Sequence, residues 1–484
     1  MTRKNIIGII NKKRKENRRK FDMIDLVKAH DLFLKEENMP VLELAKEDYE
    51  ARIARLVERI REKNFTHMVI YGDREHFSNV EYFTRYDCRF EETLFIVDAE
   101  GKKSIIVGNE GMGYSSLIPV EVDRYLYQHF SLQGQPRHKL RLLSDIIRDT
   151  GITEDSRLGI VGIKYFEEGM IDSDPDQTYD LPQYILDAIK KACPNIVNAT
   201  KELTGVPNGI RMRLYTAKEI AWAESVGNRV AAVVQRLIKN LKVGAKEYET
   251  AMLGQVGFDP TNTHPLVNFG ERSVAIGMGS PGTRELVKGT PGGLCYSLRG
   301  NLTSRVSVLA TCVEDYQDNL KPLYESFYKK YYEAVIAWYE TAKVGATGGD
   351  LHKAVMDLIG GEEFGVELNA GHCTATEEWS NAISYEGSTI PLVNGSFMQV
   401  DIIASGSDPV HTGICEDAVV IAGESLRAEL KAQYPEVYER IQTRRQVMKE
   451  VLGINLHEDV LPMSNLNGVY YPFLLNTDVV FAKR

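Results

Sequence analysis

The chain has 484 residues, a formal net charge of −10 and an apolar content of 43%. Its length exceeds that of one ordinary core, so we expect at least two domains. The acidic balance disfavours nucleic acid as a partner, and no apolar run is long enough to predict a membrane span. Six scattered cysteines and the lack of a secretory signal predict reduced thiols and a cytoplasmic location.

A basic extension, residues 1–40, opens the chain. It contains the clusters Lys12–Lys15 and Arg18–Lys20. Such clusters can bind nucleic acid or acidic lipid, but they are more often a solvated helix face or an arm that lies on a partner subunit. We favour the solvated face or the arm.

Residues 41–200 are predicted to form an α/β domain. Apolar residues at spacings of three and four indicate a first helix, and two apolar runs around the turn Glu100-Gly101 indicate a hairpin. The expected elements are a helix over Leu42–Lys63, strands over His67–Tyr71, Thr93–Val97, Ser104–Val107 and Leu158–Val161, and a helix over Leu181–Ala192.

Pro194, Gly205 and Pro207 predict a domain boundary near residues 195–205, and a second domain over residues 201–424. A long helix should run to about Leu241. The sequence Lys-Val-Gly-Ala follows it at Lys242 and recurs at Lys343. This echo indicates a duplicated helix–turn–helix unit, although Val-Gly is also a common way for a helix to end.

Residues 425–484 form a separate C-terminal segment in this prediction. The pattern over Glu429–Leu452 indicates an amphipathic helix broken at Pro435. Proline and aromatic residues then gather at Leu461–Asn465 and Tyr470–Leu474. We expect an ordered strap across a surface, at a dimer interface or at the rim of a pocket.

The stretch from Asn369 to Val420 carries the chemistry. A Gly-His pair ending at His372 precedes a turn at Pro391–Gly395, an apolar run that ends at Asp401, and an apolar run that follows Glu416-Asp417. Charged groups at strand ends can be held in a fixed relation. We therefore expect His372, Asp401 and Glu416 to share a pocket, while the alternative of three ordinary polar residues stays open.

In order and spacing, these motifs resemble the C-terminal signature of the creatinase and Xaa-Pro peptidase family. The resemblance extends over most of the chain, roughly residues 45–425. It implies an α/β (α+β) protein with a creatinase-type N-terminal α/β domain followed by a C-terminal domain of the pita-bread fold. It also implies a homodimer in which the N-terminal domain reaches the pocket of the other subunit, with Arg89 and Phe90 as the nearest substrate-contacting residues.

The same resemblance implies a degenerate metal site. Peptidases of this family bind two metal ions through Asp, Asp, His, Glu and Glu, and the last three positions fall at His372, Asp401 and Glu416. The first two positions fall at Ser297 and Val308, neither of which is acidic. We therefore expect no two-metal site and no cofactor.

Two further histidine positions of the family are also altered. They fall at Met278 and Trp379 in this chain. The other ionisable candidates for the pocket are His264, Glu377, Glu378 and His411.

Creatinase hydrolyses a C–N bond of a small guanidino acid without metal. The resemblance thus predicts a metal-independent hydrolase or lyase that cleaves a C–N bond in a small guanidino, ureido, amide or peptide-like substrate. His372 would be the acid/base, with Asp401 and Glu416 orienting it or binding a cationic group of the substrate. The expected substrate-binding residues are Arg299, Arg305, Arg89, Phe90, His264, His411 and Trp379. A non-catalytic binding module and a metallopeptidase with a rearranged ligand set remain open as alternatives.

Overall fold

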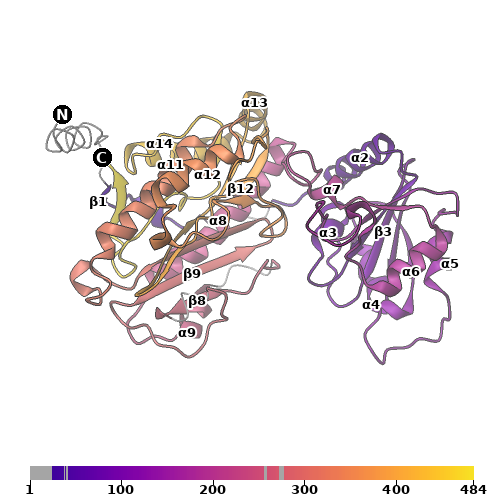
Figure 1. Cartoon of the computed structure of the whole chain (residues 1–484), viewed down its shortest axis with the longest axis horizontal. Helices are drawn as coiled ribbons and strands as arrows, with labels where there is room; N and C mark the ends of the chain where they lie inside the picture. Colours follow the sequence, from indigo (N-terminus) through magenta and orange to yellow (C-terminus); the bar gives the residue numbers. More distant parts are fainter. Residues whose placement is uncertain (1–23, 38, 40–41, 255–258, 272–276) are drawn as a thin grey trace, which may run out of the picture.

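The computed structural model describes residues 24–37, 39, 42–254, 259–271 and 277–484. The chain forms two lobes that lie side by side, and the segment around residues 205–216 connects them (Figure 1). The basic clusters Lys12–Lys15 and Arg18–Lys20 lie outside the described residues. Within those residues, no helix has both the length and the apolar character needed to cross a membrane.

The N-terminal domain is built on one six-stranded sheet with the strand order β5-β4-β3-β2-β6-β7. The hairpin β3-β4 is antiparallel, whereas β6 runs parallel to both β2 and β7. Its helices are α2 (Lys46–Glu62), α3 (Ser78–Thr84), α4 (Asn109–Tyr114), α5 (Leu143–Asp149), α6 (Gln183–Ala192) and α7 (Thr200–Thr204). Its strands are β2 (His67–Gly72), β3 (Thr93–Asp98), β4 (Lys103–Val107), β5 (Asp123–Leu126), β6 (Leu158–Val161) and β7 (Ile196–Asn198).

Alternation along β2 explains how this sheet receives helices on both faces. Successive side chains of a strand point to opposite faces. Met68 and Ile70 join the cluster that includes α2 and α3, while Val69 and Tyr71 join the cluster that includes α5 and α6. The expected α/β class of the N-terminal domain is therefore confirmed, and its sheet extends to Asn198.

The C-terminal domain contains a five-stranded sheet, β13-β14-β10-β9-β8, and a four-stranded sheet, β11-β12-β15-β16. Its helices are α8 (Ala217–Lys239), α9 (Glu247–Ala251), α11 (Lys329–Thr341), α12 (Gly348–Ile359), α13 (Glu424–Gln433) and α14 (Pro435–Glu450). Its strands are β8 (Leu266–Phe269), β9 (Pro291–Leu298), β10 (Asn301–Val308), β11 (His372–Cys373), β12 (Ser396–Gln399), β13 (Ala404–Ser407), β14 (Val410–Glu416), β15 (Ala418–Ile421) and β16 (Val460–Pro462).

Helix α8 is the central helix of this domain. The side chain of Thr216 caps it by accepting a hydrogen bond from the backbone N–H of Glu219. The helix packs against β9 and β10 on one side and against α13 on another, which is why nearly all its residues are buried. The expected echo is present in the turns, where Gly244 (φ 83°) follows α8 and Gly345 (φ 88°) follows α11. The glycines do not end the helices, because α8 ends at Lys239 and α11 at Thr341.

The two ends of the described chain meet in the C-terminal domain. Strand β1 (Ile24–Lys28) pairs with β17 (Val479–Lys483) along its whole length. Residues 24–28 are therefore part of this domain, which corrects the expectation that residues 1–40 form only an extension. The pairing could not be predicted locally, because the partners are more than 450 residues apart.

The C-terminal segment is a core element, which corrects the expected surface strap. The helix break at Pro435 is confirmed, since α13 ends at Gln433 and α14 begins at Pro435. Beyond α14, Tyr470, Tyr471 and Phe473 are almost fully buried in the main hydrophobic cluster of the domain. Aromatic rings bury a large apolar area, so the segment fills the core instead of covering it.

Candidate active site

His372, Asp401 and Glu416 converge at the ends of three strands. His372 begins β11 and lies opposite Gln399 of β12, Asp401 follows two residues after β12 ends, and Glu416 is the last residue of β14. The Nε2 atom of His372 lies 3.8 Å from Asp401 Oδ2 and 3.8 Å from Glu416 Oε1. The geometry thus brings the three expected residues together.

Glu378 completes the cluster. Its Oε1 lies 2.9 Å from Nε2 of His372, closer than either of the other carboxylates. Its side chain is 29% exposed, whereas His372 is fully buried. The sequence included Glu378 only in a wider set of ionisable residues, because its position depends on the loop that follows β11. Its neighbour Glu377 turns away and pairs with Arg211.

Gly371 explains why the sequence places a glycine before the histidine. Its φ of 89° lies in the left-handed region. A Cβ there would lie 2.8 Å from the carbonyl oxygen of Gln399 and 2.9 Å from the indole nitrogen of Trp338. Only glycine lets the backbone pass this close, which fixes the position of the His372 ring.

Trp379 covers the imidazole of His372. The two rings stack with centroids 4.1 Å apart and planes 17° from parallel, and Trp379 is 38% exposed. An aromatic face favours a cation above it, so this contact stabilises the protonated form of His372. Trp379 therefore lies beside the cluster and is partly exposed, and its expected contact with a substrate stays a prediction.

The cluster holds protons at neutral pH. Burial lowers the pKa of His372, but the neighbouring Glu378, Glu416 and Asp401 more than compensate and raise it to about 10. Burial, only partly offset by His372, raises the pKa of Asp401 to about 6. Burial and the nearby Asp401 raise the pKa of Glu416 well above its ordinary value. The group therefore combines a cationic imidazole with two carboxyl groups whose pKa values are raised.

These pKa shifts predict a pH-dependent stability. His372 binds its proton more tightly in the folded state, so its stabilising contribution is complete below pH 6.5 and is lost as the pH rises through about 10. We expect the melting temperature of the wild type to exceed that of His372→Gln at pH 6.5, and the difference to shrink toward pH 10. A difference that is constant across this range would contradict the raised pKa.

Structure comparison shows which proteins share this architecture. An Xaa-Pro dipeptidase from Bacillus anthracis matches with a TM-score of 0.58 at 15% identity, over 78% of this chain and 96% of the other. A prolidase from Thermococcus sibiricus matches with a TM-score of 0.60 at 17% identity, over 78% and 95%. A variant of Escherichia coli aminopeptidase P in complex with substrate matches with a TM-score of 0.54 at 11% identity, over 82% and 98%.

The fold is that of the Xaa-Pro peptidases. The expected fold, a creatinase-type N-terminal domain followed by a pita-bread C-terminal domain, is thereby confirmed. No protein-family model and no curated protein sequence matches the chain. The relationship is therefore visible in the fold and in short motifs, not in overall sequence identity.

The pita-bread domain of this chain lacks the first two acids of the metal site, and one of their positions needs correction. Val308 pairs with Pro291 at the far end of the β9-β10 hairpin. The residue opposite Ser297 is Leu302, so Val308 lies six residues farther along β10 and does not face Ser297. Ser297 itself is bonded to the backbone of Thr263. Neither position supplies a carboxylate.

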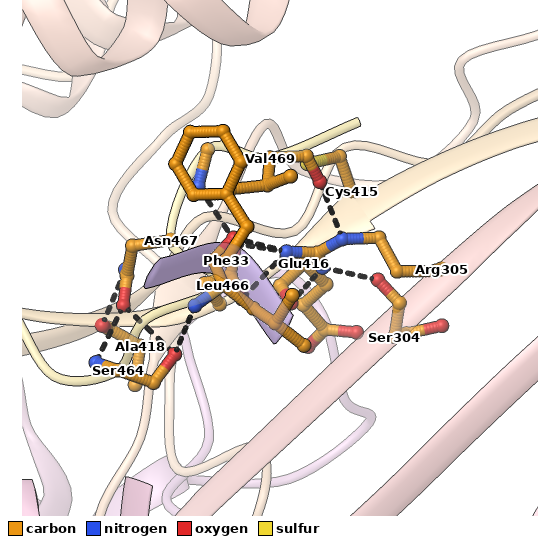
Figure 2. Close-up of polar contacts among 12 residues, drawn as sticks. Phe33, Ser304, Arg305, Cys415, Glu416, Ala418, Ser464, Leu466, Asn467 and Val469 are labelled. Carbon is orange, nitrogen blue, oxygen red and sulfur yellow. Dashed lines mark hydrogen bonds and ion pairs between the residues drawn. The ribbon is translucent and has the colours of Figure 1, made fainter. Parts of the chain in front are cut away.

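Arg305 does not reach the pocket of this pita-bread domain, which corrects its expected role in substrate binding. It is the neighbour of Ser304, the residue paired with Glu416, so its side chain points to the opposite face of the sheet. There its guanidinium pairs with Asp417 at 2.8 Å and donates to backbone carbonyls, including that of Val469 in the C-terminal segment (Figure 2). Arg305 is a structural residue.

The remaining expected substrate-binding residues are scattered. Arg299 pairs with Glu81 and Asp87 of the N-terminal domain. Arg89 and Phe90 are exposed on that domain. His264 is an exposed residue whose Nε2 lies 3.2 Å from the carbonyl oxygen of Met278.

His411 is the other expected histidine that lies elsewhere. It is buried, with its ring 4.3 Å from that of Phe327 and its Nδ1 2.6 Å from the carbonyl oxygen of Pro409. It lies five residues before Glu416 on β14, or about 17 Å along a strand. His411 packs the core and does not belong to the cluster.

Proposed function

We propose that this chain is a hydrolase that cleaves a C–N bond of amide type in a small polar or peptide-like molecule. The supporting observation is the buried imidazole of His372 held within 3.8 Å of three carboxylates. The solved proteins that share the fold are named as prolidase, Xaa-Pro dipeptidase and aminopeptidase P, which agrees with this class of reaction.

The residues of the cluster divide the proton transfers of such a hydrolysis. Glu378 has the most exposed side chain of the three carboxylates, so it can accept a proton from water as the water oxygen attacks the carbonyl carbon. The imidazolium of His372 donates a proton to the leaving nitrogen as the C–N bond breaks. The products are a carboxylic acid and an amine. Asp401 and Glu416 keep His372 protonated and oriented.

The charge of the cluster also indicates a substrate class. Three carboxylates surround one imidazole, and their buried oxygens include Asp401 Oδ1 and Glu416 Oε1, which have no hydrogen-bond partner in the described part of the chain. A cationic group would satisfy such oxygens. We therefore propose a substrate with an ammonium or guanidinium group close to the bond that is cleaved.

A divalent cation is the group that the fold family implies, and three residues fit one ion. Ligand atoms of His372, Asp401 and Glu416 lie within 4.8 Å of one another, and Asp401 and Glu416 each have a buried oxygen without a hydrogen-bond partner in the described structure. Nitrogen and oxygen donors of this kind suit a single divalent ion, which would lower the pKa of a bound water. This observation favours a second candidate function, an Xaa-Pro-type peptidase with a one-ion ligand set.

A second ion does not fit. The residues beside Glu416 across the five-stranded sheet are Ser304, Cys295 and Leu266, in that order. Cys295, Leu266 and Leu302 form a small buried hydrophobic cluster where further ligands would be needed.

We accordingly expect metal analysis of the purified protein to give at most one tightly bound ion per chain. Elemental analysis after removal of loosely bound metal is the measurement. If it gives two ions per chain, the conclusion that Ser304, Cys295 and Leu266 beside Glu416 provide no second ligand set is wrong. Turnover that survives removal of the ion would favour the metal-independent mechanism, and turnover that is lost would favour the one-ion peptidase.

A substrate screen tests the proposed function. Amides, guanidino and ureido compounds and Xaa-Pro dipeptides would be followed by release of ammonia, urea or amine, with and without chelator. We expect turnover of at least one class, lost in Glu378→Gln and retained in Glu386→Gln, a matched change on an exposed residue of the same loop region. If no class is cleaved, the result would support the non-catalytic binding module instead.

The assembly and location are proposed on two further observations. Phe90 is 62% exposed on the N-terminal domain, and exposed aromatic side chains are enriched at interfaces, which supports a homodimer. All six cysteines are free thiols, which supports a reducing compartment such as the cytoplasm.

A further inference from the structure

A cavity of about 310 Å³ lies between the two domains, apart from the His372 cluster. Its walls come from α2 and α3 on one side, and from the segment Arg211–Leu214, helix α8 and the loop Thr374–Thr376 on the other. None of the four residues of the cluster lines it. Its volume is within the range of pockets that bind small molecules.

The lining is strongly basic. Seven arginines but only four acidic residues line the cavity. Six of the seven arginines pair with an acidic side chain, in part with acids outside the lining. These pairs are Arg52–Glu219, Arg85–Glu43, Arg89–Asp87, Arg211–Glu377, Arg229–Asp259 and Arg299–Glu81.

Arg213 is the seventh arginine, and it has no acidic partner among the described residues. Its Nε is buried without a hydrogen-bond partner there. Its position is fixed, because its backbone bridges to Ser396 and its guanidinium lies 4.9 Å from the ring centroid of Tyr215. The positive charge of the lining that no described acidic side chain balances is therefore located on Arg213, whose position is fixed by these contacts.

Two neighbouring arginines also offer unused donors. The Nε atoms of Arg211 and Arg299 are buried and lack hydrogen-bond partners in the described structure. A buried donor without an acceptor destabilises the folded state. An anion in the cavity could supply acceptors for donors of this kind and balance the charge of Arg213.

We propose that this cavity binds a small ligand with an oxyanion, a carboxylate or a phosphate, and that Arg213 is its main anchor. A guanidinium matches both groups through two parallel hydrogen bonds. The loop Thr374–Thr376 begins two residues after His372, so a ligand in the cavity would contact the same loop that carries the cluster. The site is a binding site in its own right, since it uses none of the residues assigned to the hydrolysis.

The test measures binding to the full-length chain without any need for turnover. Inorganic phosphate, citrate and glutamate would be titrated by calorimetry and by thermal unfolding, with glutamine as the neutral match for glutamate. We expect at least one anion to bind saturably, and the affinity to fall at least about tenfold in Arg213→Gln, as for loss of a buried charged partner. Comparison of the affinity for phosphate with the affinities for citrate and glutamate shows whether the cavity prefers a phosphate or a carboxylate.

Two variants complete the design. Arg213→Lys keeps the charge but not the paired donors, so we expect an affinity between those of the wild type and Arg213→Gln. Arg124→Gln removes the same charge from an exposed strand of the N-terminal domain and should bind like the wild type. The proposal is overturned if no anion binds saturably, or if Arg213→Gln and Arg213→Lys both bind as tightly as the wild type.

Discussion

Replacement of His372 by alanine should reduce turnover by about two to four powers of ten, the range of general acid–base catalysis. His372 is the one imidazole in the described cluster, and it is held between Glu378 at 2.9 Å and the ring of Trp379 at 4.1 Å. Among the residues that the structure describes, no neighbour offers a second imidazole, since His411 lies far along β14. The measurement is the rate per folded molecule on whichever substrate the screen identifies.

Stability has to be measured on the same preparation. His372→Ala leaves three carboxylates without their cationic partner, so we expect a lower melting temperature as well as the lost rate. His411→Ala is the matched control, because it removes a buried histidine that packs on Phe327 and is not near the cluster. It should lower the melting temperature while the rate per folded molecule stays within about threefold, well inside the general acid–base range. If the rate per folded molecule of His372→Ala also stays within about threefold of the wild type, the proposed mechanism is refuted.

Removal of the Arg305 side chain should give the largest loss of stability, about 3–5 kcal/mol, because it leaves the buried carboxylate of Asp417 unpaired. Both members of this pair are almost fully buried. Arg305 also donates to the carbonyls of Glu416 and Val469, so its loss removes hydrogen bonds between β14 and the C-terminal segment (Figure 2). Urea unfolding of Arg305→Ala measures the effect.

Two controls separate the charge effect from lost packing. Lys353→Ala breaks an exposed pair with Asp357 on α12, for which about 0.3–0.5 kcal/mol is expected. The double variant Arg305→Met with Asp417→Leu removes both charges and should recover much of the loss, since buried pairs are often replaceable by apolar residues. If Arg305→Ala unfolds within about 1 kcal/mol of the wild type, the range of exposed pairs, the structural role given to Arg305 is wrong.

The sequence was most informative where the pattern is local. The spacing of apolar residues predicted α2, which begins at Lys46, four residues after the expected start, and alternating runs predicted the β3-β4 hairpin. Motif order predicted the convergence of His372, Asp401 and Glu416. Each of them lies at or near the end of a strand, and the apolar residues of these strands can be recognised in the sequence.

Features that depend on tertiary contacts were not predictable in this way. Glu378 contacts His372 from an irregular loop. Such a loop has no periodic pattern of apolar residues from which its conformation could be predicted. A family spacing placed the two altered metal positions at Ser297 and Val308, but the register puts Leu302 opposite Ser297 and Pro291 opposite Val308, so the two positions do not face each other. The aromatic residues of the C-terminal segment are compatible with a surface strap and with a buried core element. Only their tertiary packing shows that they belong to the core.

The pairing of β1 with β17 sets the order in which the chain can fold during synthesis. The N-terminal domain lies between them and ends near Thr204, so it can fold while the remainder is still on the ribosome. The C-terminal domain cannot close until Lys483 has emerged. At about 5–20 residues per second, β1 waits on the order of twenty seconds to a minute and a half after its own synthesis for its partner β17.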